Sequence, residues 1–286
     1  MCHKRLNMTK SKNTTVFVIL SLLCFMVGVH AKDTINFAPL PMKNATKNIQ
    51  DFVPINSYLK QKLNININYV YKNNYQDILD SFVNGDIDIA YLGPLPLVSL
   101  HQKYPYLKPI ITFNQKNGSE KYRCVLTKFK KDKFDITKKF KVALTQPLST
   151  CGYFMTQKLL KDNFGVELKN QYYDYTMSHS NAILGSLSGE FLIAGAKDSI
   201  AKKYNSIGIE IIAQSEYLPG FTLVANTKTL TFKQITQIQD ILLDIPSKVY
   251  KSWKGISSKG FVKASINDYD VIDVDFKKIP LKGNMK

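Results

Sequence analysis

The chain has 286 residues and a formal net charge of +17, from 39 lysines and arginines against 22 acidic residues. This length can form one large domain or two lobes with separate cores, and the charge favours an anionic partner. No basic run alternates with stacking aromatics, four cysteines are too few for a disulfide-dense scaffold, and the four histidines lack metal-finger spacing. Neither nucleic acid nor a metal or other cofactor is therefore expected.

Residues 1–31 are predicted to be a signal peptide. Basic residues precede an apolar run at 16–29, and small residues stand at the −3 and −1 positions of a cleavage site after Ala31. The run is too short for a comfortable transmembrane helix, so we expect export to the periplasm and contact with the membrane only through a partner. Cys24 also permits a lipoprotein interpretation, although Leu23 before it is bulky for such a site.

The rest of the chain alternates strand-like and helix-like segments. The first series comprises a strand at 34–40, a helix at 48–63, a strand at 65–71, a helix at 75–85 and a strand that runs into a Gly-Pro break at 86–94. Two further strands are predicted at 106–114 and 120–128, followed by a Lys-rich segment at 129–140. A second series then begins with a strand at 141–144 and a helix that ends at 165, and it continues through a segment at 182–204. It ends with strands near 209–220 and 221–230 and a helix at 231–245. This order predicts parallel-rich sheets covered by helices in two α/β lobes, followed by a tail that wraps back.

The turn before the helix that ends at 165 carries Ser149, Thr150, Cys151 and Gly152. The first N–H groups of a helix lack partners and lie at the positive end of its dipole, so these residues can converge on a tetrahedral oxyanion, with Gly152 allowing close approach. Two alternatives stay open. One hydroxyl could simply cap the helix, or Cys151 could be a nucleophile with His179 as its base. The stretch is no Gly-x-Ser-x-Gly elbow, which argues against an enzyme.

Two other segments could contribute to such a site. A strand that stops at Gly93 and Pro94 exposes its carboxyl end, where ligands of parallel α/β sheets bind, although a plain turn would look the same. His179 precedes a helix and could donate a hydrogen bond to an anion, but a lone histidine more often caps a helix or packs in a core.

Several segments together carry a family resemblance: FVPINSYLKQKLNININYVYKNNYQDILDSFVNGDIDIAYLGP, YRCVLT, QPLSTCGYF, SHSNAILGSLSGE and GFVKASINDYDVI. The chain resembles the substrate-binding proteins of phosphate, phosphite and phosphonate ABC transporters, the phosphonate-binding-protein-like family, over nearly all of its length after the leader. The most specific motif of that family, Ser-Thr-Ser-Gly-aromatic, reads Ser-Thr-Cys-Gly-Tyr here, from Ser149 to Tyr153.

The resemblance implies a type II periplasmic-binding-protein fold, an α/β fold of two lobes, each a mixed sheet flanked by helices, with ligand held between them. Lobe one would comprise 32–121 and 227–286, and lobe two 122–226. Two crossing strands, at about 122–127 and 220–226, would form the hinge and are counted with lobe two.

The resemblance also implies roles for individual residues. The residues expected to bind the ligand are Tyr75, Gly93, Pro94, Tyr122, Ser149, Thr150, Cys151, Gly152, His179, Asp198 and Ser199. The implied function is capture of a phosphonate, phosphite or phosphate by a monomer that delivers it to an ABC permease without catalysis. The alternative is a ligand sensor for a histidine kinase.

Some residues depart from the family pattern. Aminophosphonate binders carry carboxylates where this chain has Ser199 and Phe221, so aminoethylphosphonate is disfavoured, although the adjacent Asp198 could partly substitute. Leu192 stands where Asp is usual, and Pro96 stands where Ser is usual.

Two cysteines, Cys124 and Cys151, replace serines near the implied cleft. They could form a disulfide that stiffens the anion site. They could instead be thiols that select a thiophilic oxyanion such as arsenite, or two unrelated substitutions.

Overall fold

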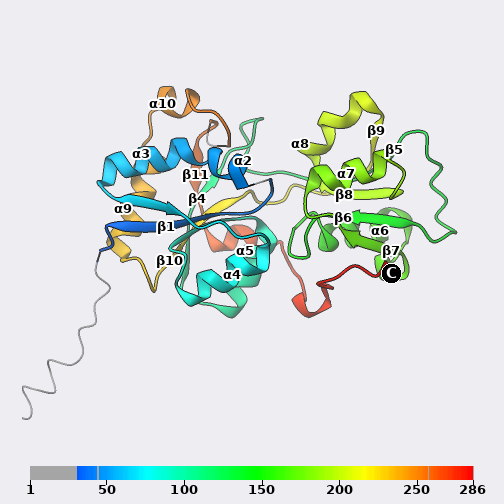
Figure 1. Ribbon diagram of the computed structural model, residues 1–286, viewed down its shortest axis with the longest axis horizontal. Helices are drawn as coiled ribbons and strands as arrows, with labels where there is room; N and C mark the ends of the chain where they lie inside the picture. The colour runs from blue at the N-terminus through cyan, green and yellow to red at the C-terminus, as the bar shows by residue number, and fades with distance from the viewer. Residues whose placement is uncertain (1–30, 44, 257, 286) are drawn as a thin grey trace, which may run out of the picture. The chain divides into compact units, whose positions relative to one another are not determined.

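The computed structural model describes residues 31–43, 45–256 and 258–285, so the predicted signal peptide lies outside the described residues except for Ala31. The chain from Ala31 onward forms one compact unit with two β-sheets and helices packed against them (Figure 1). Within the described ranges, no helix combines the length and apolar character needed to cross a bilayer.

The helices are α2 (Ala45–Gln50), α3 (Val53–Leu63), α4 (Tyr75–Asn84), α5 (Pro94–Lys103), α6 (Tyr153–Phe164), α7 (His179–Leu187), α8 (Asp198–Ala201), α9 (Phe232–Leu243) and α10 (Ser247–Lys251). Short 3₁₀ turns lie at Leu168–Asn170, Lys202–Ile207, Ile266–Tyr269 and Phe276–Lys278.

The first sheet has the strand order β11-β4-β10-β3-β1-β2. Its strands are β1 (Thr34–Pro39), β2 (Asn66–Tyr69), β3 (Ile89–Leu92), β4 (Leu107–Phe113), β10 (Thr222–Asn226) and β11 (Phe261–Lys263). β1 pairs in parallel with β2 and β3, as expected for strands joined by helical crossovers, whereas β10 and β11 run antiparallel to their neighbours. The predicted β-α-β-α-β series therefore forms the parallel half of a mixed sheet.

The second sheet has the order β7-β6-β8-β5-β9. Its strands are β5 (Cys124–Phe129), β6 (Lys141–Leu144), β7 (Tyr172–Tyr175), β8 (Ile193–Lys197) and β9 (Ile209–Gln214). β6 is parallel to β7 and β8, and β5 is antiparallel to β8 and β9. The strand β7 has no counterpart in the sequence-based prediction because only Tyr173 of its four residues is buried, so its apolar signal is weak.

Prolines set two helix boundaries. The single helix predicted at 48–63 is split, because α2 ends at Gln50 and α3 restarts at Val53 with Pro54 in its first turn. Pro94 likewise begins α5, where the sequence alone predicted only a break. Proline lacks an N–H group and therefore disrupts a helix interior. In the first turn of a helix the N–H groups have no intrahelical acceptor, so proline is tolerated there, and both helices begin at or next to a proline.

Apolar packing is richest around the first sheet, where Phe37, Ile55 and Phe82 belong to one large cluster. Smaller clusters support the second sheet. The large cluster also takes in Cys151 and Met155, which belong to the α6 region. Apolar contact therefore continues from the first sheet to the start of α6.

The chain passes between the sheets at two segments that pair with each other. Tyr122 and Leu218 form an isolated antiparallel bridge, with N–H to O distances of 3.0 and 2.8 Å. The strand β5 lies in the second sheet, as predicted, but β10 lies in the first. The assignment of 222–226 to lobe two was therefore wrong, because that strand is held between β3 and β4.

The last residues reach the other sheet. The Asn284 amide donates to the Tyr173 carbonyl at 3.0 Å, and the Tyr173 amide donates to Asn284 Oδ1 at 2.7 Å. Figure 1 shows this red tail running to the outer side of β7. The edge of a sheet leaves backbone groups unpaired, and the tail satisfies some of them. The final residues of 227–286, which were assigned to lobe one, therefore also contact the second sheet.

Candidate anion-binding site

A small pocket joins elements of both sheets. The space within it, open solvent at its mouth included, is about 220 Å³, so its enclosed part is smaller still. It is lined by Leu40, Tyr75, Gly93, Pro96, Tyr122, Ser149, Thr150, Cys151, His179 and Phe221. The pocket therefore suits a small ligand and brings together most of the residues that the sequence predicted.

Four helices begin at this pocket. Tyr75 is the first residue of α4, Gly93 is the N-cap of α5, and His179 is the first residue of α7. Cys151 comes two residues before the start of α6 at Tyr153. Each helix N-terminus carries about half a unit of positive charge, so their convergence favours an anion even though no lining residue is a lysine or arginine.

The turn before α6 leaves backbone donors free. The amides of Ser149 and Gly152 donate to the carbonyls of Gln146 and Ser149, each at 2.9 Å. The amides of Thr150 and Cys151 have no acceptor in the described part of the chain. No side chain caps α6, so the interpretation of Ser149 or Thr150 as its cap was wrong. Ser149 and Thr150 instead line the pocket.

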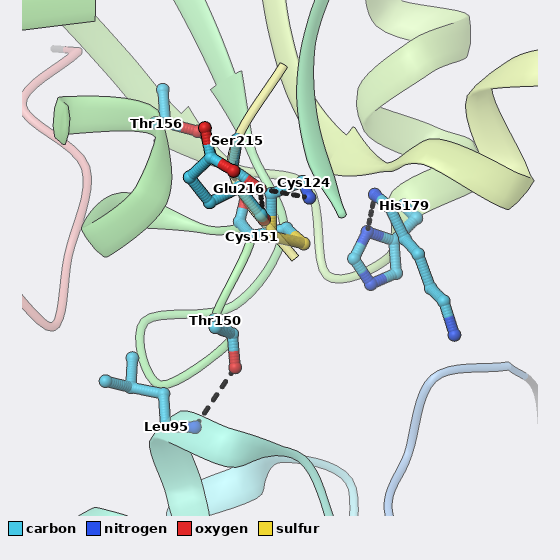
Figure 2. Close-up of a disulfide and its surroundings, with 9 residues drawn as sticks. Leu95, Cys124, Thr150, Cys151, Thr156, His179, Ser215 and Glu216 are labelled. Atoms are coloured by element: carbon cyan, nitrogen blue, oxygen red, sulfur yellow. Dashed lines mark hydrogen bonds between the residues drawn. A yellow bond between two sulfur atoms is a disulfide. The ribbon is translucent and has the colours of Figure 1, made fainter. Parts of the chain in front are cut away.

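Thr150 connects the two sides of the pocket. Its Oγ1 accepts a hydrogen bond of 3.1 Å from the amide of Leu95, near the start of α5 (Figure 2). This bond uses a lone pair of the hydroxyl and leaves its hydrogen available to a ligand. The N-termini of α5 and α6 are thus held beside each other.

Gly152 has a structural role. A Cβ there would lie 2.5 Å from the Gln146 carbonyl oxygen and 3.0 Å from the Ser149 carbonyl oxygen. Gly152 does not itself line the pocket, so close approach of a ligand to its backbone stays a prediction. Its lack of a side chain allows the turn to close tightly.

Tyr75 and Tyr122 supply protonated hydroxyls. Burial raises the pKa of both phenols well above the ordinary value, and for Tyr75 a contact with Ser149 opposes the shift only in part. The Tyr122 hydroxyl is buried and makes no hydrogen bond of good geometry among residues 31–43, 45–256 and 258–285, although nearby Thr150 opposes its pKa shift in part. A buried polar group without a partner is costly, which is consistent with a site that a ligand completes.

The imidazole of His179 is oriented by a backbone amide. Its Nδ1 accepts a hydrogen bond of 3.1 Å from the N–H of Lys197 (Figure 2). Burial, reinforced by the positive charge of Lys197, lowers the pKa of His179 to about 3. The neutral ring must then carry its proton on Nε2, which makes that nitrogen a donor.

The low pKa of His179 predicts a loss of stability in acid. Below the unfolded-state pKa of about 6.5 the unfolded chain binds a proton that the folded chain refuses, so the free energy of unfolding should fall as the pH drops from 6.5 toward 3. Urea unfolding at several pH values should show this slope, and His179→Gln should flatten it. An equal slope in both proteins would contradict the prediction.

Cys124 and Cys151 form a disulfide, with their Cα atoms 5.1 Å apart (Figure 2). The bond ties the start of β5 to the anion-binding turn. Neither sulfur is a thiol in this state, so the interpretation of the pair as thiols that select arsenite was wrong, and so was that of Cys151 as a nucleophile. The substitutions are not unrelated, since the two residues bond to each other.

Residues 37–269 match the family model for the periplasmic substrate-binding protein of phosphonate ABC transporters. The chain belongs to this family. Proteins of this phosphonate-binding family are transport components and not enzymes, so a small ligand and a permease are the partners and the periplasm is the compartment.

Solved structures share its type II periplasmic-binding-protein fold. PhnD1 from Prochlorococcus marinus, solved with methylphosphonate, is 17% identical with a TM-score of 0.73, over 84% of this chain and 96% of PhnD1. A binding protein of a phosphonate transporter from Pseudomonas aeruginosa is 16% identical with a TM-score of 0.67, over 82% and 83%. The sulphonate-binding protein SsuA from Escherichia coli is 15% identical with a TM-score of 0.54, over 74% and 70%.

In this member of the phosphonate-binding family, some predicted residues lie outside the pocket. Pro94 starts α5 without lining the pocket, which Pro96 lines instead. Asp198 pairs with Lys202 at 3.2 Å, and Ser199 is exposed. Neither lines the site, because β8 ends at Lys197 and the chain turns into α8.

Gln146 was missed by the sequence-based prediction. Its Oε1 accepts from the Tyr75 amide at 3.1 Å, and its Nε2 donates to the carbonyls of Pro41 at 3.1 Å and Met177 at 3.3 Å. It therefore joins α4 to the turn before α6. Its position in the QPLSTCG motif could have indicated a role in the site. Its hydrogen-bond partners, however, are remote in the sequence and could not be predicted from it.

Lys197 was also missed. Its Nζ donates to Gln115 Oε1 at 2.6 Å and lies 4.8 Å from the ring centre of Tyr122 and 4.9 Å from that of Phe221. Both rings line the pocket, so an ammonium group lies against its wall.

Proposed function

We propose that this protein captures a small phosphonate-type oxyanion in the pocket at the start of α6 and delivers it to an ABC permease. The observation that carries the proposal is the pair of unpaired amides of Thr150 and Cys151, in a pocket where four helices begin. Such donors bind a tetrahedral anion without a charged side chain, since their dipoles are already oriented.

Side chains complete the proposed set of donors. The hydroxyls of Ser149, Thr150, Tyr75 and Tyr122 surround the same space, and the Nε2–H of His179 adds one more. All of these donors are neutral, so the orientation of the bound anion would come from their number and placement. The two lobes would close on the ligand about the crossing segments near Tyr122 and Leu218, which excludes water and strengthens each hydrogen bond.

The ligand class follows from the size of the pocket and from the family. A pocket this small suits methylphosphonate, phosphite or phosphate better than a long-chain phosphonate. PhnD1, which has the same fold, was solved with methylphosphonate. The family description supports delivery to a transporter over presentation to a sensor kinase. We further propose that the exported form begins after Ala31.

Calorimetric titration of the purified protein with methylphosphonate, phosphite, phosphate and 2-aminoethylphosphonate tests the proposal. At least one of the first three should bind with a measurable dissociation constant. Ser149→Ala should weaken that binding about tenfold, the effect of one hydrogen bond to a charged acceptor.

The matched control is Ser188→Ala. Ser188 is exposed at the end of α7, and its hydroxyl donates to the Gly185 carbonyl, away from the pocket. Its substitution should change affinity less than twofold. If the wild-type protein binds none of the four anions, the proposed function fails.

A further inference from the structure

Lys197 carries an ammonium group that lies against two aromatic rings of the pocket lining. The side chain extends from the end of β8, and its Nζ is enclosed by the Tyr122 and Phe221 rings and by the Gln115 side-chain oxygen. No carboxylate forms an ion pair with it in the described part of the chain, and the adjacent Asp198 is engaged with Lys202.

An enclosed charge of this kind is costly to the folded protein. Burial lowers the pKa of Lys197 to about 8; Asp198 opposes this shift and Lys203 adds to it. Contacts with two ring faces and one amide oxygen recover only part of the hydration that an ammonium loses. Tyr122 and Phe221 both line the anion pocket, so an anion bound there would lie close enough to compensate this charge.

Lys197 also acts on the pocket through its backbone. Its N–H orients the ring of His179, and its charge helps to keep that ring neutral. The charged and titratable groups that face or act on the ammonium are Asp198, Lys203, His179 and the Tyr122 hydroxyl. Asp198, the carboxylate among them, is paired with Lys202, so an anion in the pocket would supply a negative charge that these groups do not.

We propose that Lys197 sets the charge preference of the pocket, favouring a doubly deprotonated oxyanion and disfavouring a ligand that carries its own ammonium group. This inference rests on the proposed function and specifies its substrate class. The charge acts across the aromatic wall, in a poorly polarisable environment where Coulomb interactions extend further than in water. Phe221 at the same wall offers an ammonium-bearing ligand no carboxylate to pair with.

The test compares methylphosphonate with 2-aminoethylphosphonate at pH 7.5 in three variants. Lys197→Met keeps the chain length against the rings and removes the charge, so it should weaken methylphosphonate binding by about 10- to 50-fold. It should also narrow the preference for methylphosphonate over 2-aminoethylphosphonate by about the same factor. Lys197→Arg retains the charge and should keep the preference.

Lys233→Met is the matched control, because Lys233 is exposed in α9 and its removal changes the net charge by the same amount. It should shift both affinities less than twofold. The inference is overturned if Lys197→Met binds methylphosphonate as the wild type does. It is also overturned if that variant loses both ligands by one common factor, which would indicate a purely structural role. Wild-type protein that binds no anion would instead overturn the proposed function, and this inference with it.

Discussion

Replacing Cys124 and Cys151 together by alanine should lower the midpoint of thermal unfolding by about 10 °C. The disulfide closes a loop with a sequence separation of 27 residues, and a cross-link of that span stabilises by about 3–4 kcal/mol, mainly by restricting the unfolded chain. For a chain of this size, each kcal/mol corresponds to about 2–4 °C. Differential scanning fluorimetry measures the change directly.

A reductant gives the control for this prediction. It should lower the midpoint of the wild-type protein by a similar amount and leave the double-alanine variant unchanged. Both half-cystines are buried, so the protein should be unfolded in the reductant before it is refolded and scanned. A double-alanine variant that unfolds within 2 °C of the wild type, roughly the effect of 1 kcal/mol, would show that the bond contributes little.

Gly152→Ala should reduce anion affinity by roughly 100-fold or more. The new Cβ would stand 2.5 Å from the Gln146 carbonyl oxygen and 3.0 Å from that of Ser149, and both are backbone atoms that move only with the turn. Moving the turn displaces the free amides of Thr150 and Cys151 together. Loss of two hydrogen bonds to a charged ligand costs about 3–6 kcal/mol, which gives this size of effect in calorimetric titration.

Gly189→Ala is the control for Gly152→Ala, because it should lower stability without changing anion affinity. Gly189 follows α7 with a φ of +80°, and a Cβ there would meet no atom within 4 Å. The left-handed conformation should cost the variant about 1 kcal/mol of stability. Its anion affinity should match that of the wild type. If Gly152→Ala also retains full affinity, the turn is more adaptable than its contacts indicate, and the amides cannot be the main donors.

Local features of the sequence predicted the centre of the site. The turn from Ser149 to Gly152 precedes a helix, and the chemistry of a helix N-terminus depends on neighbouring residues alone. The roles of Tyr75, Tyr122 and His179 came from the family resemblance and not from their spacing. The structure places all three on the pocket wall, but their contact with a ligand remains a prediction.

Long-range packing decided what the sequence could not predict. Lys197 matters because the rings of Tyr122 and Phe221 enclose its ammonium, and neither ring is near it in the sequence. Gln146 bonds to Tyr75, 71 residues away, and to Pro41, 105 residues away. Resemblance alone placed Asp198 and Ser199 at the ligand, whereas the turn from β8 into α8 directs them elsewhere.

The C-terminal tail adds a third physical link between the sheets, beside the two crossing segments. Ile272 and Ile279 anchor it in the apolar cluster of the first sheet, while Asn284 is bonded to β7 of the second. Any motion that swings the sheets apart must either stretch the four residues between Ile279 and Asn284 or detach Asn284 from β7. Detaching the tail would add to the free energy needed to separate the two sheets. A tag fused to the C-terminus would therefore act on the same opening equilibrium as the bound ligand.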